Sequence, residues 1–111
     1  RYQLQSWLTY IGTELHKNFT PFFNPAASAE MKTQAGAMLQ RRFALVESEL
    51  ASKSYLMGEG FTVADAYLFT VTSWAKFIKF DLSAFPQLQA FQTRVAARPS
   101  VQRALKAEGL I

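Results

Sequence analysis

The chain has 111 residues, of which half are hydrophobic, and it carries a formal net charge of +4, one histidine and no cysteine. This length suits one domain with one core, and the apolar content is too high for a disordered chain. No apolar run approaches the roughly 20 residues that cross a bilayer, and no signal peptide is visible. The composition therefore predicts a cytoplasmic protein with no membrane partner and no disulfide framework.

The basic residues are scattered along the chain rather than gathered in one stripe. Arg41 and Arg42 are adjacent and point in different directions on a helix, whereas Arg94 and Arg98 share a face. No aromatic side chains are interleaved with them in the way that nucleic-acid binding needs. The pattern favours a solvated basic surface over a nucleic-acid partner, and the charge can still attract anionic small molecules.

The first predicted helix runs from about Tyr2 to Lys17, because apolar residues recur at intervals of three and four on one face. This stripe contains Leu4, Trp7, Leu8, Ile11 and Leu15. The following segment, from Thr20 to Pro25, contains two prolines, and each disfavours helical geometry in the residue before it. We therefore expect a rigid loop that carries aromatic side chains.

A second helix of about 22 residues is predicted to begin after Ser28, which is a good N-cap. Glu30 lies in its first turn, where the helix dipole favours a negative charge. Gly36 lies inside it and indicates a kink or the close approach of another helix. The buried stripe is expected to contain Leu39, Phe43, Val46 and Leu50, widened by Met31, Ala35, Met38 and Leu45.

The strongest local signal is a helix from Thr62 to Lys79, which follows a glycine-rich turn at residues 58–60. Thr62 and Asp65 predict a capping box, with each side chain accepting a hydrogen bond from the backbone N–H of the other residue. Capping accounts for Asp65, so a role as a catalytic acid or base is disfavoured. The helix is apolar nearly all round, including Val63 and Phe77, which is typical of the centre of a bundle.

Two shorter helices are predicted at the end of the chain. Pro86 opens the first, with Leu88, Phe91 and Val95 directed inward, and Pro99 opens the second, which ends at Gly109. No alternating strand pattern and no internal repeat occur. The predicted fold class is all-α, with about five helices packed around the central capped helix.

The composition excludes most kinds of catalytic site. One histidine and no cysteine argue against a metal site, and neither a phosphate-binding loop nor a glycine-flanked serine occurs. His16 lies about a third of a turn from the apolar stripe and shares a polar face with Thr9 and Thr13. Simple exposure near a helix end would account for it. Alternatively, its imidazole and the Lys17 ammonium, beside aromatic residues, would suit an anionic ligand that has an apolar partner.

Three segments resemble the C-terminal helical domain of glutathione S-transferases, namely WLTYIGTELHKNFTPFF, GEGFTVADAYLFTVTSWA and AARPSVQRALKAEGL. The TELHK segment and the closing AEGL are most similar to the bacterial beta class. The resemblance covers essentially the whole chain. It implies a dimeric detoxification enzyme whose N-terminal thioredoxin-like domain, absent from these residues, holds most of the glutathione site. Because Arg1 begins without a start methionine where a domain boundary would lie, we expect a domain of a longer enzyme.

The same resemblance implies roles for individual residues. His16 would assist catalysis near the sulfur of glutathione, the co-substrate, while the pocket for the hydrophobic electrophile would be lined by Phe19, Tyr67 and Trp74. Thr9 stands where related enzymes often carry asparagine, so this contact would be made through a single hydroxyl. The implied glutathione-binding residues are Thr9, Thr13, Glu14, Leu15, His16 and Lys17.

Two functions remain open at this point. The first is the domain of a transferase in which the glutathione thiolate attacks an electrophile, with no metal involved. The alternative is a non-catalytic helical module for protein interaction. In either case we expect the isolated domain to expose an apolar patch where a partner domain would pack.

Overall fold

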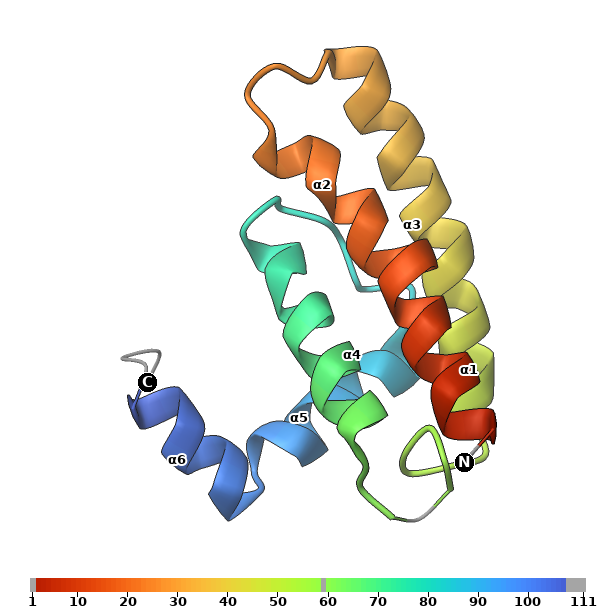
Figure 1. Cartoon of the computed structure of the whole chain (residues 1–111), viewed down its shortest axis with the longest axis vertical. Helices are drawn as coiled ribbons and strands as arrows, with labels where there is room; N and C mark the ends of the chain where they lie inside the picture. The colour runs from red at the N-terminus through yellow and green to blue at the C-terminus, as the bar shows by residue number, and fades with distance from the viewer. Residues whose placement is uncertain (1, 59, 108–111) are drawn as a thin grey trace.

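The computed structural model describes residues 2–58 and 60–107, which fold into a helical bundle (Figure 1). The elements are α1 (Tyr2–Tyr10), η1 (Ile11–His16), α2 (Lys17–Phe23), α3 (Ala29–Leu50), α4 (Val63–Ser73), η2 (Trp74–Lys76), α5 (Pro86–Ala96) and α6 (Pro99–Ala107). The first three join end to end into one rod, so the described part of the chain has the predicted all-α architecture. Within it, no helix combines the length and the apolar character that crossing a membrane requires.

The first rod continues to Phe23, so the loop predicted from Thr20 to Pro25 is wrong over most of its length. Pro21 lies inside α2, where it offers no N–H to the carbonyl four residues earlier. The rod continues because Phe19 is fully buried and Phe22 packs against the core, and this packing outweighs the missing hydrogen bond. The chain leaves helical geometry only at residue 24.

The middle of the rod, η1, is a π-helix, whereas the sequence analysis predicted an ordinary helix there. The backbone N–H of Lys17 bonds to the carbonyl of Gly12, five residues earlier, and this wider turn rotates α2 relative to α1. Ile11 and Leu15 remain fully buried through the segment, as predicted. Such segments are frequent at functional sites.

The helix α3 begins at the predicted cap, where Ser28 Oγ accepts a hydrogen bond from the N–H of Met31 at 3.1 Å. Its buried residues are Ala35, Leu39, Phe43, Val46 and Leu50. Met31 and Leu45, in contrast, are 50% and 47% exposed, because α3 has its main contacts with the first rod and α5 only. A Cβ at Gly36 would lie 3.6 Å from the ring of Phe22, which confirms the expected close approach of another helix.

The helix α4 begins at the predicted capping box of Thr62 and Asp65. One carboxylate oxygen of Asp65 accepts from the N–H of Thr62 at 2.9 Å. Of the preceding turn, Glu59 lies outside the described residues, and Gly58 has a φ of 122°, which favours glycine. The turn therefore leads directly into α4, whose first turn is capped by Thr62 and Asp65.

The helix α4 is central, but it is shorter and less enclosed than expected. It ends at Ser73, tightens into the 3₁₀ turn η2, and does not reach Lys79 as a helix. Its fully buried members, counted with η2, are Ala64, Asp65, Leu68, Val71, Thr72 and Ala75. Val63 and Phe77 are 59% and 69% exposed, so the expectation that they lie inside the bundle is wrong. They lie at the two ends of the segment, where fewer helices surround it.

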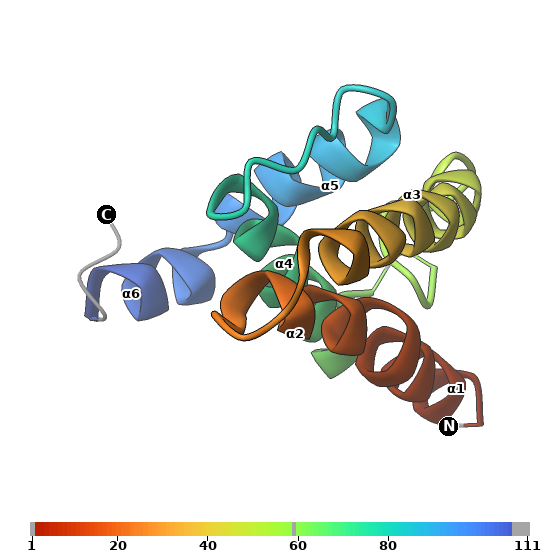
Figure 2. The same cartoon turned by 90° about the horizontal axis from the view of Figure 1, so that it is seen from above.

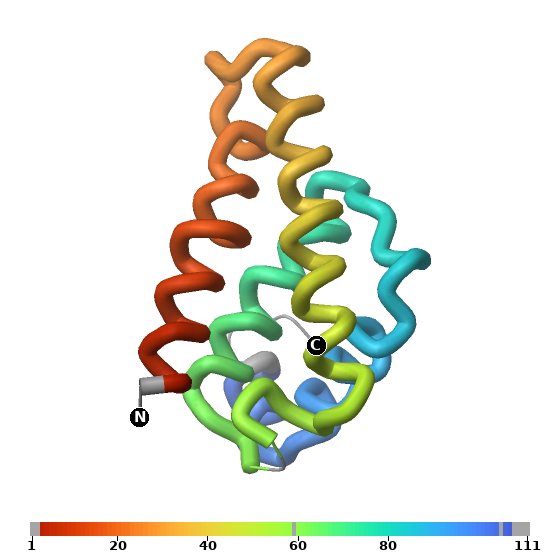
Figure 3. The backbone as a smooth tube through the Cα atoms, turned by 90° about the vertical axis from the view of Figure 1, so that its right-hand side faces the viewer, coloured from red at the N-terminus to blue at the C-terminus, as the bar shows by residue number. Residues whose placement is uncertain are grey.

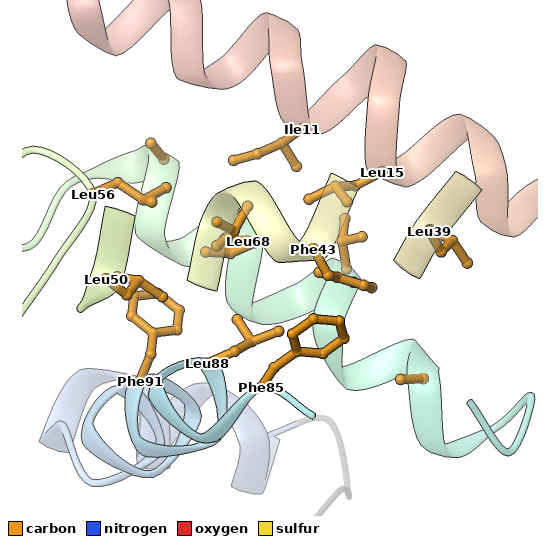
Figure 4. Packing of buried hydrophobic residues seen from close by; sticks show 14 of the residues in the cluster. Ile11, Leu15, Leu39, Phe43, Leu50, Leu56, Leu68, Phe85, Leu88 and Phe91 are labelled. Carbon is orange, nitrogen blue, oxygen red and sulfur yellow. The ribbon is translucent and has the colours of Figure 1, made fainter. Parts of the chain in front are cut away.

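The core forms where the first rod, α3, α4 and α5 meet (Figure 4). The rod and α3 run side by side in opposite directions (Figure 3), α5 covers the far side of α4, and α6 stands at the edge (Figure 2). Pro86 occupies the first turn of α5, as predicted, and Leu88, Phe91 and Val95 are buried. The predicted stop of α6 at Gly109 lies outside the described residues.

Candidate functional site

His16 is exposed at the end of η1, yet its ring is held by side chains of the central helix. Its Nδ1 lies 2.6 Å from the hydroxyl oxygen of Tyr67, a residue 51 positions away. The Trp74 ring meets the imidazole edge-on, with centroids 5.0 Å apart and planes at 75°. An exposed histidine is therefore oriented by two contacts from α4 and η2, which simple exposure at a helix end would not provide.

His16 lies in the lining of an open pocket of about 730 Å³. The lining comprises His16, Phe19, Thr20, Phe23, Asn24, Pro25, Trp74 and Phe77. Phe19 is fully buried, and Trp74 packs edge-on against both Phe19 and Phe23, with centroids 5.8 and 6.0 Å apart. The result is an aromatic pocket in which His16 is the one titratable side chain, an arrangement suited to an apolar ligand beside a reacting or polar group.

Two of the three residues predicted for the electrophile pocket, Phe19 and Trp74, lie in this lining. The third, Tyr67, contacts His16 from α4 and does not belong to it. Phe23 and Phe77 lie in the lining and were not singled out from the sequence. Phe23 follows His16 and Phe19 on one helical face, a relationship hidden by the expectation that Pro21 ends the helix.

The residues predicted to bind glutathione divide among several environments. Thr9, Thr13 and Glu14 line a second depression of about 500 Å³ on α1 and η1, together with Gln5, Ser6 and Tyr10. The Leu15 side chain is fully buried in the core, so only its backbone is available to a ligand. Lys17 is exposed. The rod thus presents two depressions, with His16 on the aromatic one.

A salt bridge and a hydrogen bond join the residues that line the second depression to α3. Glu14 pairs with Arg42 at 2.7 Å, and the Tyr10 hydroxyl donates to the Arg42 carbonyl at 2.7 Å. Thr13 donates its hydroxyl to the Thr9 carbonyl at 2.9 Å, which leaves the oxygen of Thr13 able to accept. Burial raises the pKa of Tyr10, an effect that the Arg42 charge opposes and the Glu14 carboxylate reinforces.

No group of three or more metal-ligating side chains converges within residues 2–58 and 60–107. The two depressions offer an imidazole, hydroxyls and an aromatic wall.

Residues 10–99 match the family described as "Glutathione S-transferase, C-terminal domain". The chain belongs to this family. The family resemblance seen in the sequence is thereby confirmed, and the bundle described above is the glutathione S-transferase C-terminal fold.

Relatives and solved structures agree with this assignment. The chain is 46% identical over 110 residues to glutathione S-transferase GstA of Escherichia coli O157:H7, covering 99% of this chain and 55% of the relative. It superposes with a TM-score of 0.97 on BphK, a bacterial glutathione S-transferase solved as a ternary complex, at 50% identity, covering 99% of this chain and 55% of that one.

A solved structure of the bacterial beta class is also among those similar to this chain, in agreement with the resemblance predicted from the sequence. A beta class glutathione S-transferase from Sphingomonas chungbukensis matches with a TM-score of 0.94 at 43% identity, covering all of this chain and 55% of that one. The chain thus spans little more than half the length of these relatives. A glutathione S-transferase C-terminal domain is one part of such proteins.

Proposed function

We propose that this domain forms the electrophile pocket of a two-domain glutathione transferase, which joins the thiolate of glutathione to hydrophobic electrophiles. The observation that carries the proposal is the position of His16, oriented by Tyr67 and Trp74 at an otherwise aromatic pocket. A polar group beside apolar walls suits a reaction between an anionic sulfur and an apolar carbon centre.

In this proposal the chemistry begins with glutathione as its thiolate, since the thiolate is the nucleophile. The sulfur forms a bond to the electrophilic carbon while the leaving group departs with its electron pair. A nitrogen of His16 stabilises the negative charge on sulfur through a hydrogen bond, and Phe23 and Trp74 hold the electrophile, with the buried ring of Phe19 packed behind Trp74. The tripeptide would contact Thr9, Thr13, Glu14 and Lys17, and the backbone of Leu15.

The proposal includes a thioredoxin-like N-terminal domain that carries most of the glutathione site. The length of the relatives beyond the matched part supports it, because 45% of GstA (100 − 55) lies outside the match. The exposed apolar side chains of Val63 and Phe77 on the central segment suit contact with a further domain. A homodimer that detoxifies electrophiles in the cytoplasm completes the proposal.

The test uses the enzyme that contains this domain, assayed with glutathione and chlorodinitrobenzene as the electrophile. We expect His16→Ala to lower kcat/KM by about 10- to 100-fold, because a hydrogen bond to a charged sulfur is lost. Gln40→Ala, at an exposed position of α3, is the matched control and leaves the rate unchanged.

Two results would contradict the proposal in different ways. Unchanged turnover and unchanged glutathione affinity in His16→Ala would remove His16 from the mechanism. No glutathione-dependent activity toward any of a panel of hydrophobic electrophiles, in a folded wild-type enzyme, would favour the non-catalytic interaction module instead.

A further inference from the structure

We propose that Tyr67 is a positioning residue, which fixes the neutral imidazole of His16 with its proton on Nε2. His16 then presents a hydrogen-bond donor to a ligand in the aromatic pocket. The catalytic consequence rests on the function proposed above, whereas the orientation of the ring rests on the geometry alone.

Two observations favour the Tyr67 hydroxyl as the donor: the contact is short, and its oxygen has no other hydrogen-bond partner among the described residues. The 2.6 Å between Nδ1 of His16 and the oxygen of Tyr67 is shorter than the roughly 2.7–3.2 Å usual for N–H donors to oxygen. Hydroxyl donors form shorter hydrogen bonds than N–H donors do, as the roughly 2.5–3.0 Å between the oxygens of an O–H···O bond shows. In the proposed arrangement the phenol O–H of Tyr67 donates and Nδ1 accepts. Because a neutral imidazole has one donor and one acceptor nitrogen, the proton lies on Nε2.

Few groups near the Tyr67 hydroxyl can form a hydrogen bond with it. Among the residues that the structure describes, Nδ1 of His16 is its one hydrogen-bond partner. Its oxygen also lies close to the backbone of the π-helix, since a Cβ built on Gly12 would be 3.5 Å from it. Trp74 also packs edge-on against the imidazole. The ring is held before any ligand arrives.

This orientation assigns His16 the role of a donor rather than of a base. Nε2 lies across the ring from Nδ1, and within the described part of the chain it bonds to no other residue. An N–H at this position can donate to the thiolate of glutathione and stabilise its charge throughout the attack. It has no lone pair with which to take up the thiol proton, which passes to water.

The 111-residue chain allows a direct test, because His16 is its single histidine. We would label histidine with nitrogen-15 and record the ring nitrogen signals at a pH where the imidazole is neutral. The expected result is a single Nε2–H tautomer in the wild type and a mixture of tautomers in Tyr67→Phe. Tyr55→Phe is the control, because its hydroxyl accepts from Arg98 instead.

A wild-type spectrum with the proton on Nδ1 would overturn the proposal, as would an unchanged spectrum in Tyr67→Phe. Circular dichroism would establish that each variant is folded. If Tyr67→Phe did not fold, the wild-type spectrum would still decide the tautomer.

A kinetic cycle in the two-domain enzyme tests the catalytic consequence. We expect Tyr67→Phe to lower kcat by about three- to ten-fold, as loss of one hydrogen bond would, with little change in KM for glutathione. In a His16→Ala background the same substitution should have no further effect. An equal loss in both backgrounds would mean that Tyr67 acts independently of His16, and would overturn the positioning role.

The two tests also separate the two proposals. If the spectra fit the tautomer assignment but His16→Ala has full activity, the proposed function fails and the positioning of the ring stands. If His16→Ala is impaired and the spectra contradict the assignment, the function stands and the role of Tyr67 fails.

Discussion

The carboxylate of Asp65 accepts a hydrogen bond at 2.9 Å from the backbone N–H of Leu56, a residue nine positions earlier in the chain. Its other oxygen accepts from the N–H of Thr62 at 2.9 Å and from the Thr62 hydroxyl at 3.2 Å. Asp65 and Leu56 are both buried. One carboxylate therefore caps α4 and fastens to it the turn that comes before it.

Asp65→Ala is expected to lower the free energy of unfolding by about 3 kcal/mol or more, because a buried N–H loses its partner and the helix loses its cap. Asp65→Asn keeps one acceptor oxygen and should cost about 1–2 kcal/mol. Urea unfolding of the chain measures both. Asp81→Ala is the control: Asp81 also accepts from a nearby N–H, that of Ser83, but it is exposed. Equal unfolding midpoints for Asp65→Ala and Asp81→Ala would contradict the account.

Phe19 and Phe23 both line the aromatic pocket but should respond differently to truncation. Phe19→Ala removes a fully buried ring and is expected to cost about 3–5 kcal/mol of stability. Phe23 is 53% exposed, so Phe23→Ala should change stability by less than about 1 kcal/mol. In the two-domain enzyme it should instead raise KM for a hydrophobic electrophile. A large stability loss in Phe23→Ala, with KM unaltered, would show that its ring supports the fold rather than the pocket.

Gly36→Ala is expected to stabilise the chain by about 0.5–1 kcal/mol, because alanine is the better helix former. The added Cβ would lie 3.6 Å from the ring of Phe22, which is an ordinary van der Waals distance. Ala37→Gly, at the adjacent exposed position, should destabilise by a similar amount and serves as the reciprocal control. Thermal unfolding measures both; a lower melting temperature in Gly36→Ala would mean that α2 and α3 lie closer than described.

The partly buried side chain of Tyr10 predicts a loss of stability at alkaline pH. Because burial raises the pKa of Tyr10 in the folded chain, the unfolded chain releases this proton first, near pH 10. The contribution is therefore fully present below about pH 10 and is lost as the pH rises through the folded pKa. Tyr10→Phe should flatten the decline measured by urea unfolding above pH 9–10, in the range set by the ordinary tyrosine value of about 10. An unchanged alkaline decline would place its cause elsewhere.

The starts of α3, α4 and α5 could be predicted because their signals are local. Ser28, the Thr62–Asp65 pair and Pro86 each act on backbone groups within one turn, and each occupies the expected position. The polar placement of His16 was likewise predictable, because helical periodicity alone separates it from the buried stripe.

The remaining features depend on contacts between distant residues. The continuation of the helix through Pro21 depends on burial of Phe19 against α3 and η2, which outweighs a local preference. The partner of His16 lies 51 positions away, and no spacing rule pairs the two. One local signal for η1 was present in the sequence. The buried residues Ile11, Leu15 and Phe19 are spaced four residues apart twice in succession. An ideal α-helix needs alternating steps of three and four to hold one face.

The wide turn of η1 sets the angle about the rod axis at which α2 follows α1. Deleting one residue between Ile11 and His16 would remove the residue that the wide turn accommodates, so the rod would continue as an ordinary α-helix. Adding one residue there would act differently, because the turn is already wide: α2, with the aromatic wall, would rotate by about 100° relative to α1. The register between the two depressions thus depends on the number of residues in η1, and an insertion there would change it in one step where substitutions would not.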